Sequence, residues 1–213
     1  MKTSSLVILF LMLLGGPAGA DETMTKVVFR QEAPEIASGS FGAKPKTLYL
    51  WGNEKGRVEE APDPDRHLTG LMIANGKDGW MINLYDNTGR HFIDPGPTYN
   101  FYVPIVPQEK PKTPPPVKDF QIGRELAFMK NRNVSPTSAT KDGKQLSLYQ
   151  DTQDGYILQV YVDPATGLPA ESDVLKGGTF VLRLVYSDYE TSLPADPSLF
   201  QPPAGIKISE AGP

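Results

Sequence analysis

The last third of the chain, residues 156–208, constrains the fold most, because two segments within it alternate apolar and polar residues. A period of two residues is typical of a β-strand with one buried face. Turns that contain proline and glycine separate the segments, at 163–169 and 177–178. This pattern predicts a curved antiparallel sheet. The shared faces are Leu158, Val160 and Val162 in the first segment, and Phe180, Leu182, Leu184 and Tyr186 in the second.

Earlier parts of the mature chain repeat this organisation. Short turns with glycine, asparagine and aspartate separate them, which favours antiparallel neighbours in chain order. Residues 47–51 place Leu48 and Leu50 on one face, and residues 80–85 place Trp80, Ile82 and Leu84 on one face. We expect roughly eight to ten strands in total. The further strand segments are 26–29, 57–60, 71–74, 90–93, 146–149 and the stretch 170–176 between the two turns of the last third.

Residues 120–130 carry the one convincing helical period of the mature chain, and Asp119 precedes them as an N-cap. The segment before it, 104–116, contains six prolines and is expected to be an extended, exposed loop. A helix with one apolar side must pack on another element, and the concave face of the sheet is the natural place. Its apolar side consists of Phe120, Ile122, Leu126, Phe128 and Met129.

The first twenty residues have the pattern of a secretory signal peptide. Lys2 supplies the positive region, residues 6–14 are apolar, and small residues precede a cleavage point after Ala20. The apolar run is too short for a transmembrane helix, which needs about 20 residues. No cysteine follows it, so we expect an exported, soluble protein without a lipid anchor, with residues 21–213 forming a single domain.

Charge and cysteine content exclude several classes of function. The chain carries 21 Lys and Arg against 25 Asp and Glu, a net charge of −4, and loss of the signal peptide lowers it to −5 because Lys2 is its only charged residue. This acidic balance without a basic cluster argues against nucleic-acid binding. The absence of cysteine removes disulfides and thiolate chemistry, and favours the bacterial periplasm over a eukaryotic secreted context.

No local motif indicates catalysis or metal binding. The chain has no Gly-x-Ser-x-Gly motif, and its two histidines, His67 and His91, lack the spacing of metal ligands. Acidic residues at 59–60 and 188–190 could meet another carboxylate across the sheet, which leaves a hydrolase as a lesser alternative. We therefore expect no enzyme, no metal and no cofactor.

The apolar faces of the predicted strands exceed what one short helix covers. Leaving several such side chains in water is costly, since burial of each stabilises a protein by about 1.5–3 kcal/mol. Either the sheet closes and fills itself with an ordinary packed core, or it stays partly open and holds a hydrophobic guest. The residues alone leave both alternatives open.

The end of the chain resembles the periplasmic lipoprotein-carrier family (LolA-like proteins) and the wider outer-membrane lipoprotein-sorting group. The resemblance rests on Asp-Pro-Ala-Thr-Gly-Leu-Pro at 163–169, Val-Tyr-Ser-Asp-Tyr at 185–189 and Leu-Phe-Gln-Pro-Pro-Ala-Gly-Ile at 199–206. It implies an incomplete β-barrel closed by helices, with a hydrophobic cavity for acyl chains. The mature chain departs from the family at its start, where the family has an amphipathic helix and residues 21–29 show no helical period.

Pattern and resemblance together predict an α+β, mostly antiparallel β domain: a half-open, LolA-like β-barrel with a helix packed on its concave face. We expect a non-enzymatic periplasmic carrier that holds a lipid or acylated lipoprotein, aided by a delivery partner at the inner or outer membrane and without a membrane span of its own. The alternative is an envelope structural or interaction module with a filled barrel. The predicted cavity wall is Leu48, Leu50, Trp80, Ile82, Leu84, Phe120, Leu126, Leu158, Val160, Phe180, Leu182 and Leu184.

Overall fold

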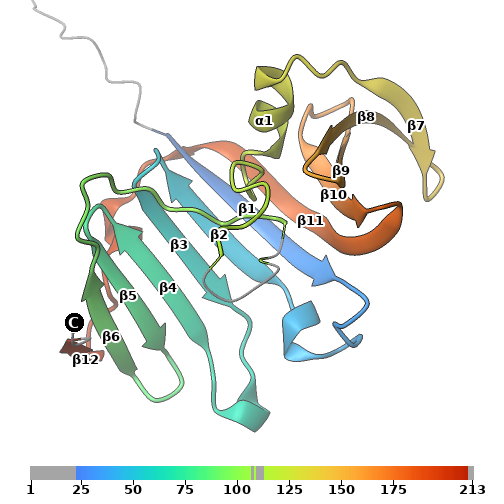
Figure 1. Ribbon diagram of the computed structural model, residues 1–213. Coiled ribbons are helices and arrows are strands. Elements are labelled where there is room, and N and C mark those ends of the chain that lie inside the picture. Colours follow the sequence, from blue (N-terminus) through green and yellow to red (C-terminus); the bar gives the residue numbers. More distant parts are fainter. Residues whose placement is uncertain (1–22, 107, 109–112, 211–213) are drawn as a thin grey trace, which may run out of the picture.

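The computed structural model describes residues 23–106, 108 and 113–210. The predicted signal peptide, residues 1–20, lies outside them. The described residues form one sheet of twelve strands and one α-helix, α1 (Glu125–Asn131), with three short 3-10 helices at 41–43, 64–66 and 197–200 (Figure 1). The strands are β1 (Thr23–Glu32), β2 (Lys46–Trp51), β3 (Lys55–Glu60), β4 (Gly70–Asn75), β5 (Asp78–Asn83), β6 (Thr88–Ile93), β7 (Thr137–Lys141), β8 (Lys144–Gln153), β9 (Tyr156–Val162), β10 (Pro169–Lys176), β11 (Thr179–Pro194) and β12 (Lys207–Glu210).

The sheet is open rather than closed into a barrel. Its strand order is β12-β6-β5-β4-β3-β2-β1-β11-β10-β9-β8-β7, and every neighbouring pair is antiparallel except β12 with β6. The long strand β11 lies beside β1 and thereby joins the hairpins of the first half of the chain to those of the second half. This confirms the predicted α+β, mostly antiparallel and half-open architecture. The sequence pattern missed two strands, the edge strands β7 and β12.

A segment between β6 and α1 crosses the face of the sheet that we call concave. Its described parts, residues 94–106 and 113–124, run in front of the central strands in Figure 1, and we call them the crossing segment. Its two arms are joined by hydrogen bonds from Ile105 N–H to the Phe120 carbonyl (2.9 Å) and from Ile122 N–H to the Val103 carbonyl (3.0 Å). In the proline-rich stretch 104–116, Ile105 and Val106 are buried rather than exposed, and residues 107 and 109–112 lie outside the described residues.

Helix α1 is shorter than the helical period predicts. It begins at Glu125, because Gly123 takes a positive φ of +83° and the residues before it pair with the other arm of the crossing segment. The predicted helix 120–130 is thus wrong over its first five residues. The apolar residues that were expected on a helix still reach the sheet: Phe120 and Ile122 do so from the crossing segment, and Met129 does so from α1.

Each face of the sheet carries its own apolar cluster. The first lies on the concave face between β1, β2, β9, β10 and β11 on one side and the crossing segment with α1 on the other. The second lies on the opposite, convex face, where Leu71, Ile73 and Ile82 pack under the C-terminal tail, residues 193–206. Phe200 anchors that tail, with its ring centroid 5.8 Å from that of Trp51. Within the part of the chain that the structure describes, no helix has the length and apolarity needed to cross a membrane.

Candidate functional site

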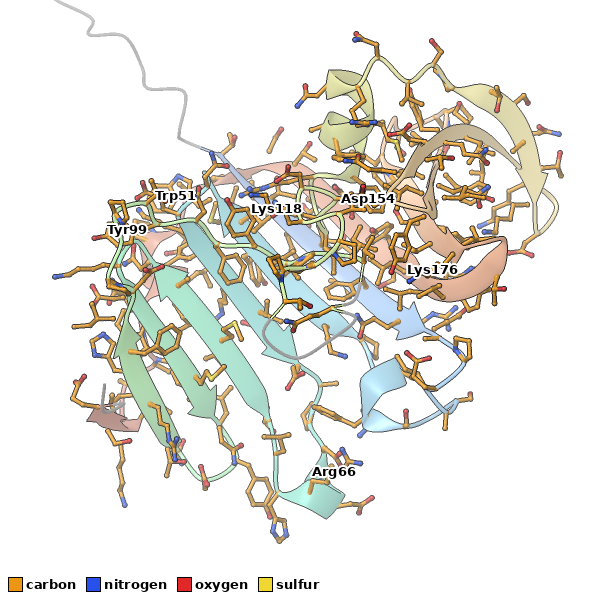
Figure 2. All side chains as sticks on the ribbon, in the orientation of Figure 1. Trp51, Arg66, Tyr99, Lys118, Asp154 and Lys176 are labelled. Atoms are coloured by element: carbon orange, nitrogen blue, oxygen red, sulfur yellow. The ribbon has the colours of Figure 1, made fainter. Side chains whose placement is uncertain are left out.

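Eight of the twelve predicted cavity residues belong to the first cluster. All eight are fully or largely buried against other side chains of the same chain. Figure 2 shows side chains occupying the space between the crossing segment and the sheet. A ligand can reach these eight residues only if the crossing segment moves away from the sheet. Their role in ligand binding therefore stays a prediction. They are Leu48, Leu50, Phe120, Leu126, Leu158, Val160, Leu182 and Leu184.

The other four predicted residues lie elsewhere. Trp80, Ile82 and Leu84 belong to the second cluster, on the convex face under the C-terminal tail. Phe180 is half-buried under the guanidinium of Arg183, which lies 5.6 Å from its ring centroid. The twelve residues therefore do not form one wall. The C-terminal tail covers the convex face of β5 and of the residue that follows its end. It therefore packs against Trp80, Ile82 and Leu84.

Two glycines explain how aromatic rings come to lie on the concave face. A Cβ atom on Gly56 would be 1.9 Å from the ring of Phe101, so that ring rests directly on the β3 backbone. A Cβ atom on Gly79 would likewise be 2.2 Å from the ring of Phe92. Gly56, Ala74, Gly79 and Phe92 lie opposite one another across β3 to β6. Phe101 thus fixes where the crossing segment meets the sheet, and no described segment covers the strands beyond it.

The part of the concave face that no described residue covers carries exposed apolar side chains. Val58, Met72 and Met81 lie directly opposite one another on β3, β4 and β5. Met72 and Met81 are 37% and 54% exposed, and Phe92 and Tyr102 beside them are 38% and 47% exposed. Four of the seven exposed large apolar residues of the described chain therefore gather at this place. We call Val58, Met72, Met81, Phe92 and Tyr102 the methionine groove.

Three hollows follow the methionine groove. One of about 220 Å³ lies between Met72, Phe92 and Tyr102, and a second of about 220 Å³ lies between Val58, Met72 and Met81. A third, of about 510 Å³, shares Met81 and extends to the edge strands β6 and β12. Small-molecule sites typically measure about 300–1,000 Å³. The hollows together are therefore large enough for a small apolar guest, although each is open to solvent.

Helix α1 is tied to the sheet by a fully buried carboxyl group. Glu125 accepts hydrogen bonds from the hydroxyls of Tyr186 and Tyr189 on β11, the latter at 3.0 Å, and from the Gly123 N–H at 3.0 Å. Burial raises the pKa of Glu125 above its ordinary value, although these hydrogen bonds oppose the shift. Tyr186 also contacts the hydroxyl of the buried Ser172. This polar cluster lies inside the first apolar cluster and fixes the start of the helix.

Three of the four acidic residues that the sequence offered for hydrolysis are bound in ion pairs, whereas Glu60 borders the hollow between Val58, Met72 and Met81. Glu59 pairs with Arg57 at 2.6 Å. Asp188 and Glu190 both pair with Lys26, at 2.6 and 3.1 Å. Of the four acids, only Glu60 borders a hollow in the described part of the chain, so they form no carboxylate pair there.

Two buried acids on β10, Glu171 and Asp173, were not predicted from the sequence. Glu171 and Asp173 accept charged hydrogen bonds from Lys141 on β7 and Arg183 on β11. Burial raises the pKa of Glu171, whereas for Asp173 the hydrogen bonds from Arg183 and Lys141 outweigh burial and lower the pKa. The network closes the face of β9 to β11 that points away from α1. Among the described residues, no group of three or more acidic or histidine side chains is placed to hold a metal ion.

No protein-family model matches the chain, and no curated protein matches it by sequence. Among solved structures, an uncharacterized conserved protein from Thermus thermophilus is similar over 89% of this chain and 91% of its own, with 9% identity and a TM-score of 0.49. An outer-membrane lipoprotein-sorting protein domain from Vibrio parahaemolyticus is similar over 84% and 89%, with 11% identity and a TM-score of 0.38. A chain of the Pseudomonas aeruginosa MucA/MucB complex is similar over 84% of this chain but only 56% of its own, with 13% identity and a TM-score of 0.40.

The methionine groove was missed because sequence analysis favoured the more hydrophobic face of β5. Trp80, Ile82 and Leu84 are more apolar than Met81, Asn83 and Tyr85, which alternate with them. The signal for the open face was present in Met72 and Met81, two flexible apolar residues on adjacent predicted strands. A binding face must remain partly exposed before its guest arrives, and it is therefore less apolar than a face that the chain itself covers.

Proposed function

We propose that the protein is an exported, non-enzymatic binding or carrier protein that holds the acyl chain of a lipid or acylated protein in the methionine groove. The observation that carries this proposal is the gathering of Met72, Met81, Phe92 and Tyr102, all partly exposed, around connected hollows on one face of the sheet. Exposed apolar residues scattered singly are ordinary, but a contiguous set beside hollows is typical of a binding surface.

Methionine suits a guest of variable shape. Its side chain is unbranched, has three rotatable bonds and adapts to irregular apolar surfaces, as in proteins that bind many partners. Met72 and Met81 border two hollows each, so either side chain can move and widen the connection between them. Burial of each methionine by a guest would contribute about 1.5–3 kcal/mol.

The periplasm is the proposed location, and it rests on the signal-peptide pattern of residues 1–20 together with the absence of cysteine. In that compartment an acyl chain cannot cross the aqueous space unaided. A carrier would exchange its cargo with membrane proteins at the inner or outer membrane, and such proteins are the proposed delivery partners.

The second candidate is a structural or interaction module whose barrel is filled. It is favoured by the crossing segment, which already buries Phe101, Ile105, Phe120 and Ile122 against the sheet. In this case the methionine groove would receive an apolar side of a protein partner rather than a lipid. The two candidates differ in whether a purified protein takes up a free acyl chain.

Binding of Nile red, an uncharged fluorescent probe, tests the proposal. We expect saturable binding by the mature protein, and Met81→Glu is expected to weaken it by about tenfold, because a charge in the groove opposes entry of an apolar guest. Ile93→Glu is the matched control, since Ile93 is 59% exposed and lies on the convex face of β6. Unchanged binding by Met81→Glu, or an equal loss in both variants, would contradict the proposed site.

A further inference from the structure

The third hollow gives the methionine groove a basic end. It shares Met81 with the groove and is bordered by Arg90 on β6 and Lys207 on β12. Arg90 lies directly opposite Met81, so the two side chains point to the same face of the sheet. Lys207 pairs with Thr88, two residues before Arg90 on the same strand. Apolar and cationic side chains therefore meet at one place on the concave face.

Neither cation has a carboxylate partner among the described residues. Among the residues that the structure describes, Arg90 and Lys207 form no ion pair, whereas Lys26, Arg57, Lys141 and Arg183 each bind carboxylates. Two adjacent unpaired cations are notable in a chain whose net charge is −4. They create a local positive potential in an otherwise acidic molecule.

The nearest acids have other partners, although Asp86 lies at Thr88, which borders the same hollow and pairs with Lys207. Glu210 on β12 binds His91, which points to the convex face together with Trp80. Asp86 in the turn before β6 accepts hydrogen bonds from Thr88. Glu60 lies on the concave face but on β3, three strands from Arg90, which is roughly 14 Å at the usual strand spacing. Among the described residues, none of these three acids forms an ion pair with Arg90 or Lys207.

The dimensions fit one acyl chain. From β3 to β12 the hollows extend over four strand intervals, roughly 19 Å. One leaflet contributes about half of the roughly 30 Å hydrocarbon core of a bilayer, so a membrane acyl chain has a comparable length. An acyl chain that lies across Met72 and Met81 would place its end group beside Arg90 and Lys207.

We propose that the methionine groove with Arg90 and Lys207 is a site for a single-chain anionic lipid, a long-chain carboxylate, with its tail over Met72 and Met81 and its carboxylate at the two cations. This inference rests on the proposed function and adds the ligand class. Guanidinium groups bind carboxylates through paired hydrogen bonds, and Lys207 adds a second positive charge within the same hollow.

Displacement of Nile red by dodecanoate and by dodecanol tests the proposal, because the two competitors share one apolar tail and differ in the head group. The wild-type protein is expected to bind dodecanoate about tenfold more tightly than dodecanol, and added salt should reduce the difference. In the double variant Arg90→Glu/Lys207→Glu, dodecanoate binding should fall by about tenfold or more while dodecanol binding stays unchanged.

The double variant Lys130→Glu/Lys144→Glu is the control, since it changes the net charge equally at exposed sites on α1 and β8. It should bind both competitors as the wild type does. Equal affinity of the wild type for dodecanoate and dodecanol, or an equal loss in the control, would overturn the assignment of the head group and leave the proposed function standing. Failure of Nile red and dodecanol to bind at all would overturn the proposed function itself.

Discussion

The hydroxyl of Tyr189 on β11 donates a hydrogen bond of 3.0 Å to the carboxyl group of Glu125, the first residue of α1. Tyr186 donates to the other carboxyl oxygen of Glu125. Because Glu125 has no exposed surface, these bonds form inside the apolar cluster, where the loss of a partner is expensive. The helix that covers part of the concave face is therefore held by one buried polar cluster.

Glu125→Ala is expected to lower the free energy of unfolding by about 2–3 kcal/mol, since it leaves two tyrosine hydroxyls without their acceptor in the core. Chemical denaturation monitored by circular dichroism measures this change. Glu125→Gln, which keeps an acceptor of the same shape, should cost about 1 kcal/mol or less. Equal losses in both variants would contradict this ranking, because Glu125→Gln keeps the side-chain volume and one acceptor oxygen.

The difference in unfolding free energy between the wild type and Glu125→Gln should depend on pH. The pKa of Glu125 is raised above its ordinary value of 4.5 by burial, so its favourable contribution is complete below that value and is lost as the pH rises through the raised pKa. Glu125→Gln does not ionise. Between about pH 4 and about pH 7 its stability is therefore expected to improve relative to wild type. A constant difference over this range would contradict the raised pKa.

Gly56→Ala is expected to destabilise the protein by about 1–3 kcal/mol, because the new Cβ atom would overlap the ring of Phe101. Gly42→Ala is a suitable control, since its Cβ atom would make only ordinary contact with Ile36, at 3.5 Å. We expect the control to lie within about 0.5 kcal/mol of wild type in thermal and chemical denaturation. A neutral Gly56→Ala would show that the crossing segment does not rest on β3 through Phe101.

His91 connects the edge strand β12 to the sheet. Its ring nitrogens lie 2.8 Å from Glu210 Oε2 and 2.9 Å from Asp78 Oδ1, and these hydrogen bonds, that of Glu210 first, raise the pKa of His91 above 6.5. The contribution of this contact to stability is therefore present below about pH 6.5 and is lost as the pH rises through the raised pKa.

NMR titration of the His91 ring measures this pKa directly. Glu210→Gln removes the largest cause of the shift, and the pKa of His91 is expected to fall towards its ordinary value. Identical titration curves for the two proteins would show that β12 does not contact His91 in solution.

Arg183→Met should destabilise the protein by about 2–3 kcal/mol, because the buried acids Glu171 and Asp173 would then share Lys141 alone. Arg30→Met is the matched control, since its pair with Glu32 is largely exposed and worth under about 1 kcal/mol. Urea denaturation of both variants tests this ranking. A larger loss for Arg30→Met would contradict the account of the network.

The strand pattern predicted the architecture because a period of two residues is imposed by the strand itself. It did not decide which face of β5 is open, since both faces carry apolar residues and the covered one is the more apolar. The tail that covers Ile82 includes Phe200, some 118 positions later in the chain. No local pattern contains that contact.

The start of helix α1 also depends on contacts that a local sequence pattern does not contain. The apolar spacing of 120–130 is real, but Phe120 and Ile122 belong to the crossing segment, and the positive φ of Gly123 separates them from the helix. Glu125 would be assigned to a solvated face by its charge alone. Its partners Tyr186 and Tyr189 lie 61 and 64 positions away, so only the fold brings them to it.

The proposed acyl chain lies over Met72 and Met81. The most direct test is NMR of the mature protein with ¹³C-labelled methionine methyl groups, titrated with dodecanol. Met24 in the convex cluster and Met129 under α1 are fully buried and serve as controls within the same molecule. We predict that the Met72 and Met81 signals shift and saturate together while those of Met24 and Met129 remain in place. Shifts confined to Met24 or Met129, or no shift at all, would contradict the account.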